Sequence, residues 1–372
     1  MNERPRVLFV SRRIRTPLPE GERRKWAAVG EHLDFRMLAA GRPDGTGAEF
    51  RLFGEPSRLA GPAYYAALPA RIARELRAFR PDVVVAQGTH ETAAALAARR
   101  LAGVDTAVIA DVHGDFHAPT RLYGSRLRSL LNPVADRVAA TALRRADAVR
   151  TISSFTTGLV RAHGVEPAQV FPAYVDAATF RERPPAPLPD VPHALFVGVL
   201  ERYKNIDGLV DAWPLVERSL PEARLLIIGV GRERALVDRL VARTSTVTWE
   251  ARRSHDGIAA ALDASSALVL PSRSEGLPRI VIEAFCRGRP VVGARAGGIP
   301  DIVEDGVNGL IVPAGETEAL AGAIMRLLSD RELQQRLGAA ARESADEWLQ
   351  TPEQFAARLR ELVVRAAAHA AA

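Results

Sequence analysis

The amino-acid sequence predicts an α/β protein with two doubly wound, parallel-sheet domains that face a central cleft. Short and continuously apolar runs, such as RVLFVS at residues 6–11 and PDVVVAQG at 81–88, alternate with longer amphipathic stretches. This alternation is typical of strands that helices cover on both faces of a parallel sheet. The pattern stops at a Pro-rich stretch and then starts again. The 372 residues also exceed one typical core and suffice for two domains.

The first domain is predicted to span residues 1–181. Two further strands are expected at TAVIADVHG, residues 106–114, and at ADAVRTIS, residues 146–153. The Ala- and Arg-rich stretches LPARIARELRAF and ETAAALAARRLA are expected to be helices. In such sheets ligands bind at the carboxyl ends of the strands. Polar residues at strand ends are therefore the first candidates for a site.

A linker and a second domain of the same design follow. ERPPAPLPDVPHA, residues 182–194, is interpreted as the linker because its prolines fit neither a helix interior nor a central strand. The second domain is predicted over residues 195–350, with strands LFVGVL, ARLLIIG, VTWEA, ALVLPS, RPVVGA and GLIVP. Residues 351–372 begin with TPEQ, which supplies an N-cap and an early proline, and are predicted to form an amphipathic helix. Whether this helix packs on the first domain stays open at this point.

Composition narrows the classes of function. No apolar run approaches the ~20 residues of a membrane-spanning helix. The N-terminal MNERPRVLFVSRR lacks the pattern of a secretory signal, and the single cysteine, Cys286, excludes an internal disulfide, so we expect a cytoplasmic protein. No set of His, Asp or Glu residues has metal-ligand spacing, and no metal site is expected. The net charge of +6 is compatible with nucleic acid, anionic lipid or an anionic substrate.

The stretch PSRSEGLPRIVIEAFCRG, residues 271–288, places two acids around a predicted helix start. The helix is expected to begin with Pro278, and a helix start offers free N–H groups and a positive dipole end to an anion. The expected N–H donors are those of Gly276, Leu277, Arg279 and Ile280. Glu275 precedes the helix and Glu283 lies about 7.5 Å along its axis. Both can flank a phosphorylated sugar or nucleotide. The alternative is that Glu275 is an ordinary helix-start acid and Glu283 a solvated helix residue.

Residues 271–313 resemble the signature block of the retaining glycosyltransferases of family 4, the glycosyl transferases group 1. The resemblance rests on the two glutamates with seven residues between them, on GRPVV and GGIP, and on DGVNGLIV. FVGVLERYKNIDGLVDAW and RLLIIGVGRERALVDRL resemble two further elements of that family. In the first half, DVHGD and LRRADAVRTISSF match more loosely. The resemblance implies the GT-B fold, in which two Rossmann-like domains enclose the cleft.

The resemblance also implies roles for particular residues. His113, Lys204 and Glu275 would be catalytic: His113 lies close to the transferred sugar, Lys204 neutralises the diphosphate, and Glu275 contacts the sugar hydroxyls. Glu283 would hold the ribose. The full set implied for the donor is Gly198, Arg202, Lys204, Glu275, Gly276, Leu277, Arg279, Ile280 and Glu283. One family arginine is replaced by Val199, and Arg202 in the same turn is the candidate substitute.

The activity implied is transfer of a hexosyl-type sugar from a UDP-, GDP- or ADP-sugar to an acceptor hydroxyl, with retention and without a covalent intermediate. The leaving phosphate would help take the acceptor's proton. No bound cofactor is expected, and the nucleotide sugar is a substrate. Such chemistry belongs to cell-envelope or polysaccharide synthesis. Alternatives left open are a sugar-nucleotide epimerase or phosphorylase of the same fold, a non-enzymatic nucleotide-sugar binder, and a nucleic-acid binder, which the 6% of aromatic residues disfavours.

The acceptor site is less defined. SRRIRTPLPEGERRKW, residues 11–26, replaces the glycine-rich turn that the family has after its first strand. Arg12, Arg13 and Arg15 follow that strand and are the candidate acceptor residues, with a solvated loop as the alternative. The acceptor is expected to be a glycan, a lipid or a small molecule. The same arginines would favour peripheral contact with an anionic membrane, at about 1 kcal/mol per basic residue near its surface.

Overall fold

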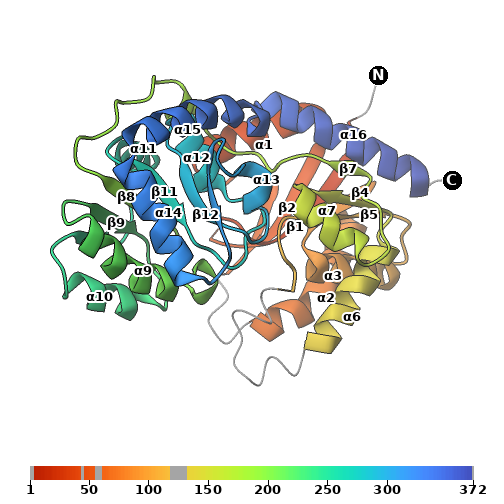
Figure 1. The fold of residues 1–372 in the computed structure, drawn as a ribbon. Helices are drawn as coiled ribbons and strands as arrows, with labels where there is room; N and C mark the ends of the chain where they lie inside the picture. The colour runs from red at the N-terminus through yellow and green to blue at the C-terminus, as the bar shows by residue number, and fades with distance from the viewer. Residues whose placement is uncertain (1–3, 43–45, 55–60, 118–131, 371–372) are drawn as a thin grey trace. The chain divides into compact units, whose positions relative to one another are not determined.

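The computed structural model describes residues 4–42, 46–54, 61–117 and 132–370, and these residues form two compact units. Unit 1 comprises residues 1–175 together with 350–372, and unit 2 comprises residues 176–349. Each unit has its own parallel sheet with helices packed on it (Figure 1). The prediction of two doubly wound, Rossmann-like domains is confirmed.

The sheet of unit 1 has the strand order β3-β2-β1-β4-β5-β6-β7, and all its pairings are parallel. Its strands are β1 (Arg6–Arg13), β2 (Asp34–Ala40), β3 (Phe50–Phe53), β4 (Val83–Gln87), β5 (Ala107–Val112), β6 (Ala148–Thr151) and β7 (Gln169–Val170). Its helices are α1 (Glu20–His32), α2 (Gly61–Phe79), α3 (Thr89–Ala102), α6 (Asn132–Arg145), α7 (Ser154–Arg161) and α16 (Pro352–Ala370).

Strand β1 shows why this sheet is covered on both faces. Val7 and Phe9 point into a core shared with α1 and α16, whereas Leu8 and Val10 point into a core shared with α2 and α3. Successive side chains of a strand alternate between faces, so an unbroken apolar run needs apolar cover on both. The continuous run RVLFV therefore specifies a central strand.

The sheet of unit 2 has the strand order β10-β9-β8-β11-β12-β13 and is also parallel. Its strands are β8 (His193–Val197), β9 (Arg224–Ile228), β10 (Val247–Glu250), β11 (Ala267–Leu270), β12 (Val291–Ala294) and β13 (Gly309–Val312). Its helices are α8 (Ala178–Arg181), η1 (Arg202–Lys204), α9 (Ile206–Ser219), α10 (Arg234–Val241), α11 (His255–Asp263), α12 (Arg279–Cys286), α13 (Ile299–Ile302), α14 (Thr317–Ser329), α15 (Arg331–Ser344) and η2 (Ala345–Trp348).

The Pro-rich stretch expected to be a linker is part of unit 2. Arg287 is 2% exposed and donates to the carbonyl oxygens of Arg183 and Pro184 at 2.9 and 3.0 Å. Arg289, also 2% exposed, donates to those of Ala186 and Pro187 at 2.8 and 3.2 Å. Prolines leave carbonyl oxygens without helix or sheet partners, and these two buried guanidiniums supply the donors. The chain instead passes between units at 175–176 and 349–350.

The last helix, α16, belongs to unit 1. Phe355, Leu359, Leu362 and Val363 are buried in the core that also contains residues of α1 and β1. This spacing puts one apolar stripe of the helix on the sheet. Among the described residues, no helix is long and apolar enough to cross a membrane.

Candidate functional site

The turns after β11 and β12 meet at Glu275. Gly298 donates its N–H to the Glu275 carbonyl oxygen at 2.9 Å. Gly297 has a φ of +57°, and a Cβ there would lie 2.2 Å from the same oxygen. Only glycine allows both this left-handed conformation and this close approach. The GGIP turn therefore fixes the backbone that carries Glu275.

Lys204 and Glu275 form a buried ion pair. Lys204 Nζ lies 2.5 Å from Glu275 Oε1, and the two side chains are 10% and 11% exposed. Lys204 ends η1, which follows β8, and its amine lies against the Gly198 turn, where a Cβ would be 3.7 Å from Nζ. Removing two charges from water costs several kcal/mol, which their mutual attraction offsets. The structure thus brings two of the predicted site residues into direct contact.

Arg273, which the sequence analysis missed, ties the turn after β11 to the turn after β8. Its guanidinium donates to the two carboxylate oxygens of Asp207 at 3.0 and 2.8 Å and to the Arg202 carbonyl oxygen at 3.0 Å. The backbone N–H of Arg273 donates to the Tyr203 carbonyl oxygen at 2.6 Å. Burial raises the pKa of Asp207, but the Arg273 hydrogen bonds and charge outweigh burial and lower it. These bonds hold the two turns of the site together.

The start of α12 differs by one residue from the expectation. Pro278 is the N-cap, and the helix begins at Arg279. Within the described part of the chain, the N–H groups of Arg279 and Ile280 have no hydrogen-bond partner. Gly276 and Leu277 lie half-buried just before them. This helix start keeps N–H groups and the positive end of its dipole for an anion.

Glu283 lies in the middle of α12 and is half-buried. Burial raises its pKa to about 7; the charge of Arg279 acts against this rise, and that of Asp176 adds to it. Its carboxylate makes no hydrogen bond with any residue that the structure describes. A carboxylate in this state gains from a ligand that donates hydrogen bonds to it.

The structure gives Arg202 no fixed role. Val199 is 45% exposed, and Arg202, the candidate substitute for the missing arginine, is also exposed. The Arg202 guanidinium forms no ion pair within the described residues. Whether it reaches a ligand stays a prediction.

In unit 1, His113 follows β5 and has a partner on each ring nitrogen. Gln87 Nε2 lies 3.1 Å from Nδ1, and Asp111 Oδ2 lies 2.8 Å from Nε2. Gln87 in turn accepts from Ser11 Oγ at 2.7 Å. The site analysis from sequence missed Gln87 and Asp111, although both lie at or near strand ends. His113 is thus a half-buried, fixed side chain at the carboxyl ends of the central strands.

The three arginines expected to bind the acceptor, Arg12, Arg13 and Arg15, are exposed at the end of β1 and just after it. Burial raises the pKa of the Glu91 carboxyl, and the positive charge of nearby Arg12 acts against this rise. Glu91 is 4% exposed in the first turn of α3 and accepts from Tyr65 Oη at 3.0 Å. The basic residues therefore stand beside a buried acid.

Cys286 is buried in α12. Among the described residues, no group of three or more His, Cys, Asp or Glu side chains is arranged to hold a metal ion.

Comparisons with curated proteins identify relatives of the chain. It is 34% identical over 163 residues to the sulfoquinovosyl transferase SQD2 of Arabidopsis thaliana, an alignment that covers 43% of this chain and 31% of that protein. It is 27% identical over 234 residues to the alpha-D-kanosaminyltransferase of Streptomyces kanamyceticus, covering 59% and 60%. These matches span less than two thirds of the relatives' lengths.

Solved structures share the fold along nearly the whole chain. Sucrose-phosphate synthase from Thermosynechococcus elongatus has a TM-score of 0.81 at 20% identity and covers 97% of this chain and 99% of its own. Anabaena Alr3699/HepE in complex with UDP and glucose has a TM-score of 0.69 at 18% identity, covering 96% and 99%. Residues 8–173 match the family model for the glycosyl transferase 4-like domain, and residues 180–344 match that for glycosyl transferases group 1. The chain belongs to the glycosyl transferases group 1 family and has the GT-B type of fold.

Proposed function

We propose that this protein is a retaining glycosyltransferase that moves a hexosyl-type sugar from a nucleoside-diphosphate sugar to an acceptor hydroxyl. The observation that carries the proposal is the buried Lys204–Glu275 pair, in the same unit as a helix start whose first N–H groups have no partner among the described residues. Family membership and the residues of that pair support the same conclusion.

The proposed donor site divides its tasks by chemistry. Lys204 and the N–H groups at the start of α12 would take the diphosphate, since both offer positive charge. Glu275 would accept hydrogen bonds from the sugar hydroxyls. Glu283, half-buried and without a hydrogen bond from the described residues, would accept from the ribose hydroxyls. A bound nucleotide sugar would thus donate hydrogen bonds to Glu275 and Glu283, and its diphosphate would pair with Lys204.

The proposed reaction breaks the bond between the anomeric carbon and the diphosphate oxygen and forms a bond from the acceptor oxygen to that carbon. The acceptor attacks on the face that the diphosphate leaves, so the configuration is retained. The acceptor's proton passes to the departing diphosphate, which is more basic once its bond to carbon has broken. Negative charge grows on that diphosphate, and Lys204 would stabilise it where it develops.

The names of some relatives and neighbours support particular nucleotide sugars as the first donors to test. Two relatives, from Mycolicibacterium smegmatis and Corynebacterium glutamicum, are GDP-mannose-dependent mannosyltransferases. One structural neighbour was solved with UDP-glucose. UDP- and GDP-sugars are therefore the first donors to test, with ADP-sugars as the third class. An acceptor in cell-envelope or polysaccharide synthesis fits these relatives.

We place the acceptor on unit 1, where Arg12, Arg13 and Arg15 would hold an anionic glycan, lipid or small molecule. The protein would work in the cytoplasm, in peripheral contact with an anionic membrane. No nucleic-acid partner is part of the proposal. Arg12→Gln should raise the KM for the acceptor and leave the KM for the donor unchanged.

Thermal unfolding in the presence of nucleotide sugars tests the donor site. A ligand that binds only the native state raises the melting temperature according to its affinity and concentration. We expect at least one nucleoside diphosphate and its sugar to do so at millimolar concentration. Glu283→Ala should reduce the shift, and Glu275→Ala should reduce turnover more than the shift. Glu347→Ala, an exposed acid in η2, is the control. No shift with any nucleotide would contradict the proposal.

Analysis of products separates the alternatives. A transferase releases a nucleoside diphosphate and a glycosylated acceptor. An epimerase of the same fold would return a changed sugar or sugar nucleotide without an acceptor, a phosphorylase would need inorganic phosphate, and a non-enzymatic binder would shift the melting temperature without product.

A further inference from the structure

A hollow of about 690 Å³ lies between helices α3 and α6 of unit 1, and the functional site described above makes no use of it. Its apolar lining comes from Leu96 and alanines of α3 and from Val134 and Val138 of α6. Val134 is 58% exposed and Val138 is 38% exposed, one helical turn apart. Such a volume is in the range of small-molecule sites, about 300–1,000 Å³.

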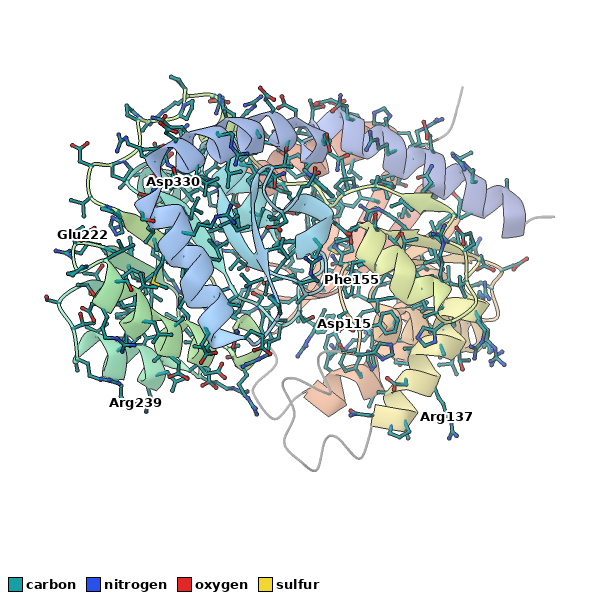
Figure 2. All side chains as sticks on the ribbon, in the orientation of Figure 1. Asp115, Arg137, Phe155, Glu222, Arg239 and Asp330 are labelled. Carbon is teal, nitrogen blue, oxygen red and sulfur yellow. The ribbon has the colours of Figure 1, made fainter. Side chains whose placement is uncertain are left out.

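The groove is also cationic. Arg99, Arg100, Arg137 and Arg145 line it, and none of the lining residues that the structure describes is acidic. Arg99 forms an ion pair with Asp147. The other three have no ion pair with any described residue. Figure 2 shows the labelled Arg137 projecting outward from α6.

We propose that the α3–α6 groove docks unit 1 on an anionic phospholipid surface. The exposed valines would sit among the glycerol and upper acyl groups, while the arginines would reach the phosphates at the level of the headgroups. Among its described lining residues the groove has no aromatic side chain on which bases could stack, which disfavours single-stranded nucleic acid. Exposed valines beside arginines on the same two helices match the apolar and anionic layers of a bilayer interface. This inference deepens the proposed membrane contact by assigning it a surface, and it does not depend on the proposed transferase activity.

Cosedimentation with vesicles tests this docking. The full chain should bind phosphatidylglycerol-containing vesicles and bind phosphatidylcholine vesicles at least tenfold more weakly. Arg100→Gln and Arg137→Gln should each weaken binding about fivefold, and Val138→Ser should weaken it at low and high salt alike. Arg239→Gln, an exposed residue of α10 in unit 2, is the matched control.

Equal binding to both vesicles, no binding, or variants indistinguishable from Arg239→Gln would overturn the proposal. Binding of an acidic amphipathic peptide without binding of vesicles would assign the groove to a protein partner instead. Circular dichroism of each variant checks that the fold is retained.

A second inference rests on a different observation, the polar row beneath His113. Gln87, Asp111 and Arg150 are register partners on three adjacent parallel strands, so their side chains share one face of the sheet. Arg150 donates to Asp111 Oδ1 at 2.8 Å, and Asp111 Oδ2 lies 2.8 Å from His113 Nε2. The row connects a buried guanidinium to the imidazole ring through one carboxylate.

The Arg150 guanidinium is fixed by contacts besides the one to Asp111. It is 1% exposed, and its second nitrogen donates to the carbonyl oxygens of Phe171 and Pro172, both at 3.0 Å. Its guanidinium stacks 3.8 Å from the Phe171 ring centre. Burial raises the pKa of Asp111, but the charge of Arg150 and the hydrogen bonds from His113 and Arg150 outweigh burial and lower it to about 2. Asp111 therefore remains a carboxylate at any physiological pH.

We infer that Asp111 and Arg150 are positioning residues that fix the tautomer and orientation of His113. The Asp111 carboxylate can only accept, so the proton of His113 lies on Nε2 and is donated to Asp111 at 2.8 Å; Arg150 Nη1 lies farther from Nε2, at 3.3 Å. Nδ1 is then free to accept from the Gln87 amide nitrogen. A buried ion pair stabilises a fold less than apolar packing of the same volume would. What apolar residues could not supply is a fixed acceptor for the ring N–H. The consequence for turnover rests on the proposed function, whereas the tautomer does not.

Nitrogen-15 NMR of the histidine rings in the free protein tests the tautomer without any substrate. Wild type should show a protonated Nε2 and an unprotonated Nδ1 for His113, assigned with His113→Gln. Asp111→Ala should convert this signal to mixed tautomers. Asp147→Asn, which breaks the Arg99 ion pair in the same unit, is the matched control and should leave the signal unchanged. Arg150→Lys should retain more of the wild-type signal than Arg150→Met.

If the protein transfers sugar, Asp111→Asn should lower kcat about tenfold to a hundredfold, with the KM for the nucleotide sugar within about twofold. Asp111→Ala with an unchanged ring signal would overturn the inference even in a fully active enzyme. A changed ring signal with no transferase activity in wild type would refute the proposed function alone.

Discussion

Glu283→Gln should make the ligand-free protein more stable at pH 8 while weakening its binding of nucleotides. Burial raises the pKa of Glu283 to about 7 from an ordinary value of 4.5. Between these two values the native carboxyl keeps a proton that the unfolded chain has released. Stability is therefore lost as pH rises from about 4.5 to about 7, and the full cost is present above pH 7. Glutamine keeps the shape of the side chain and cannot ionise.

The size of the effect follows from the pKa. A rise from 4.5 to about 7 corresponds to about 3 kcal/mol, at roughly 1.4 kcal/mol per tenfold change in acidity. At pH 5 most of this cost is absent, because pH 5 lies only about half a unit above the ordinary value of 4.5 and the unfolded chain gains little by releasing this proton. For a unit of this size, about 1 kcal/mol shifts the melting temperature by ~2–4 °C. The variant should thus melt several degrees above wild type at pH 8 and close to it at pH 5.

Thermal unfolding of both proteins at pH 5 and pH 8, with and without UDP and GDP, measures both effects. The nucleotide-induced shift at pH 8 should be smaller in the variant, because an amide accepts hydrogen bonds from ribose hydroxyls less strongly than a carboxylate does. Glu347→Gln is the control for an exposed acid. A stability gain equal at the two pH values would refute the argument from ionisation, and an unchanged nucleotide shift would refute the assigned contact.

Two further predictions address the scaffold. Gly297→Ala should lower turnover strongly, because the added Cβ would lie 2.2 Å from the Glu275 carbonyl oxygen. Gly306 also has a positive φ, but a Cβ there would meet no described atom within 4 Å, so Gly306→Ala should cost only about 1–2 kcal/mol of stability. Arg287→Ala should lower the free energy of unfolding in urea by about 3–5 kcal/mol, since it leaves buried carbonyl oxygens and Asp263 unpaired. Arg331 donates to the same Pro-rich stretch from an exposed position, so Arg331→Ala should lower the free energy of unfolding by less than about 1 kcal/mol. Equal losses of stability in the two variants would contradict this account.

The strands and the donor-side residues could be predicted because their signals are local. Each buried strand is an unbroken apolar run, and the turns after β8 and β11 carry their polar residues within a few positions of a strand end. The resemblance to a known family then assigned Lys204 to the same site as Glu275. The local signals could not show that they pair with each other, because the contact joins positions 71 apart.

The missed residues share a different property. Arg273 and Arg150 were passed over as turn or strand residues, since one arginine in an Arg-rich chain carries no pattern. Their partners, Asp207 and Asp111, lie 66 and 39 positions away. The Pro-rich stretch was misplaced for the same reason: proline content showed that it is neither helix nor strand, but not that Arg287 holds it within unit 2. Long-range hydrogen bonds of this kind are set by the completed fold.

Glu275 and Glu283, the two glutamates that the sequence singled out, differ in whether a ligand must break an existing ion pair to bind them. Glu275 already has Lys204, so a sugar that takes its carboxylate must come with an anion that takes the amine. A complete nucleotide sugar carries both groups, whereas a free sugar would leave a buried charge unpaired. Glu283 has no hydrogen-bonding partner among the described residues, so any ribose gains there, with or without a sugar attached. The nucleoside diphosphate alone should therefore bind better than the free sugar, because either fragment leaves one partner of the Lys204–Glu275 pair unmatched and only the nucleotide gains the ribose contact at Glu283.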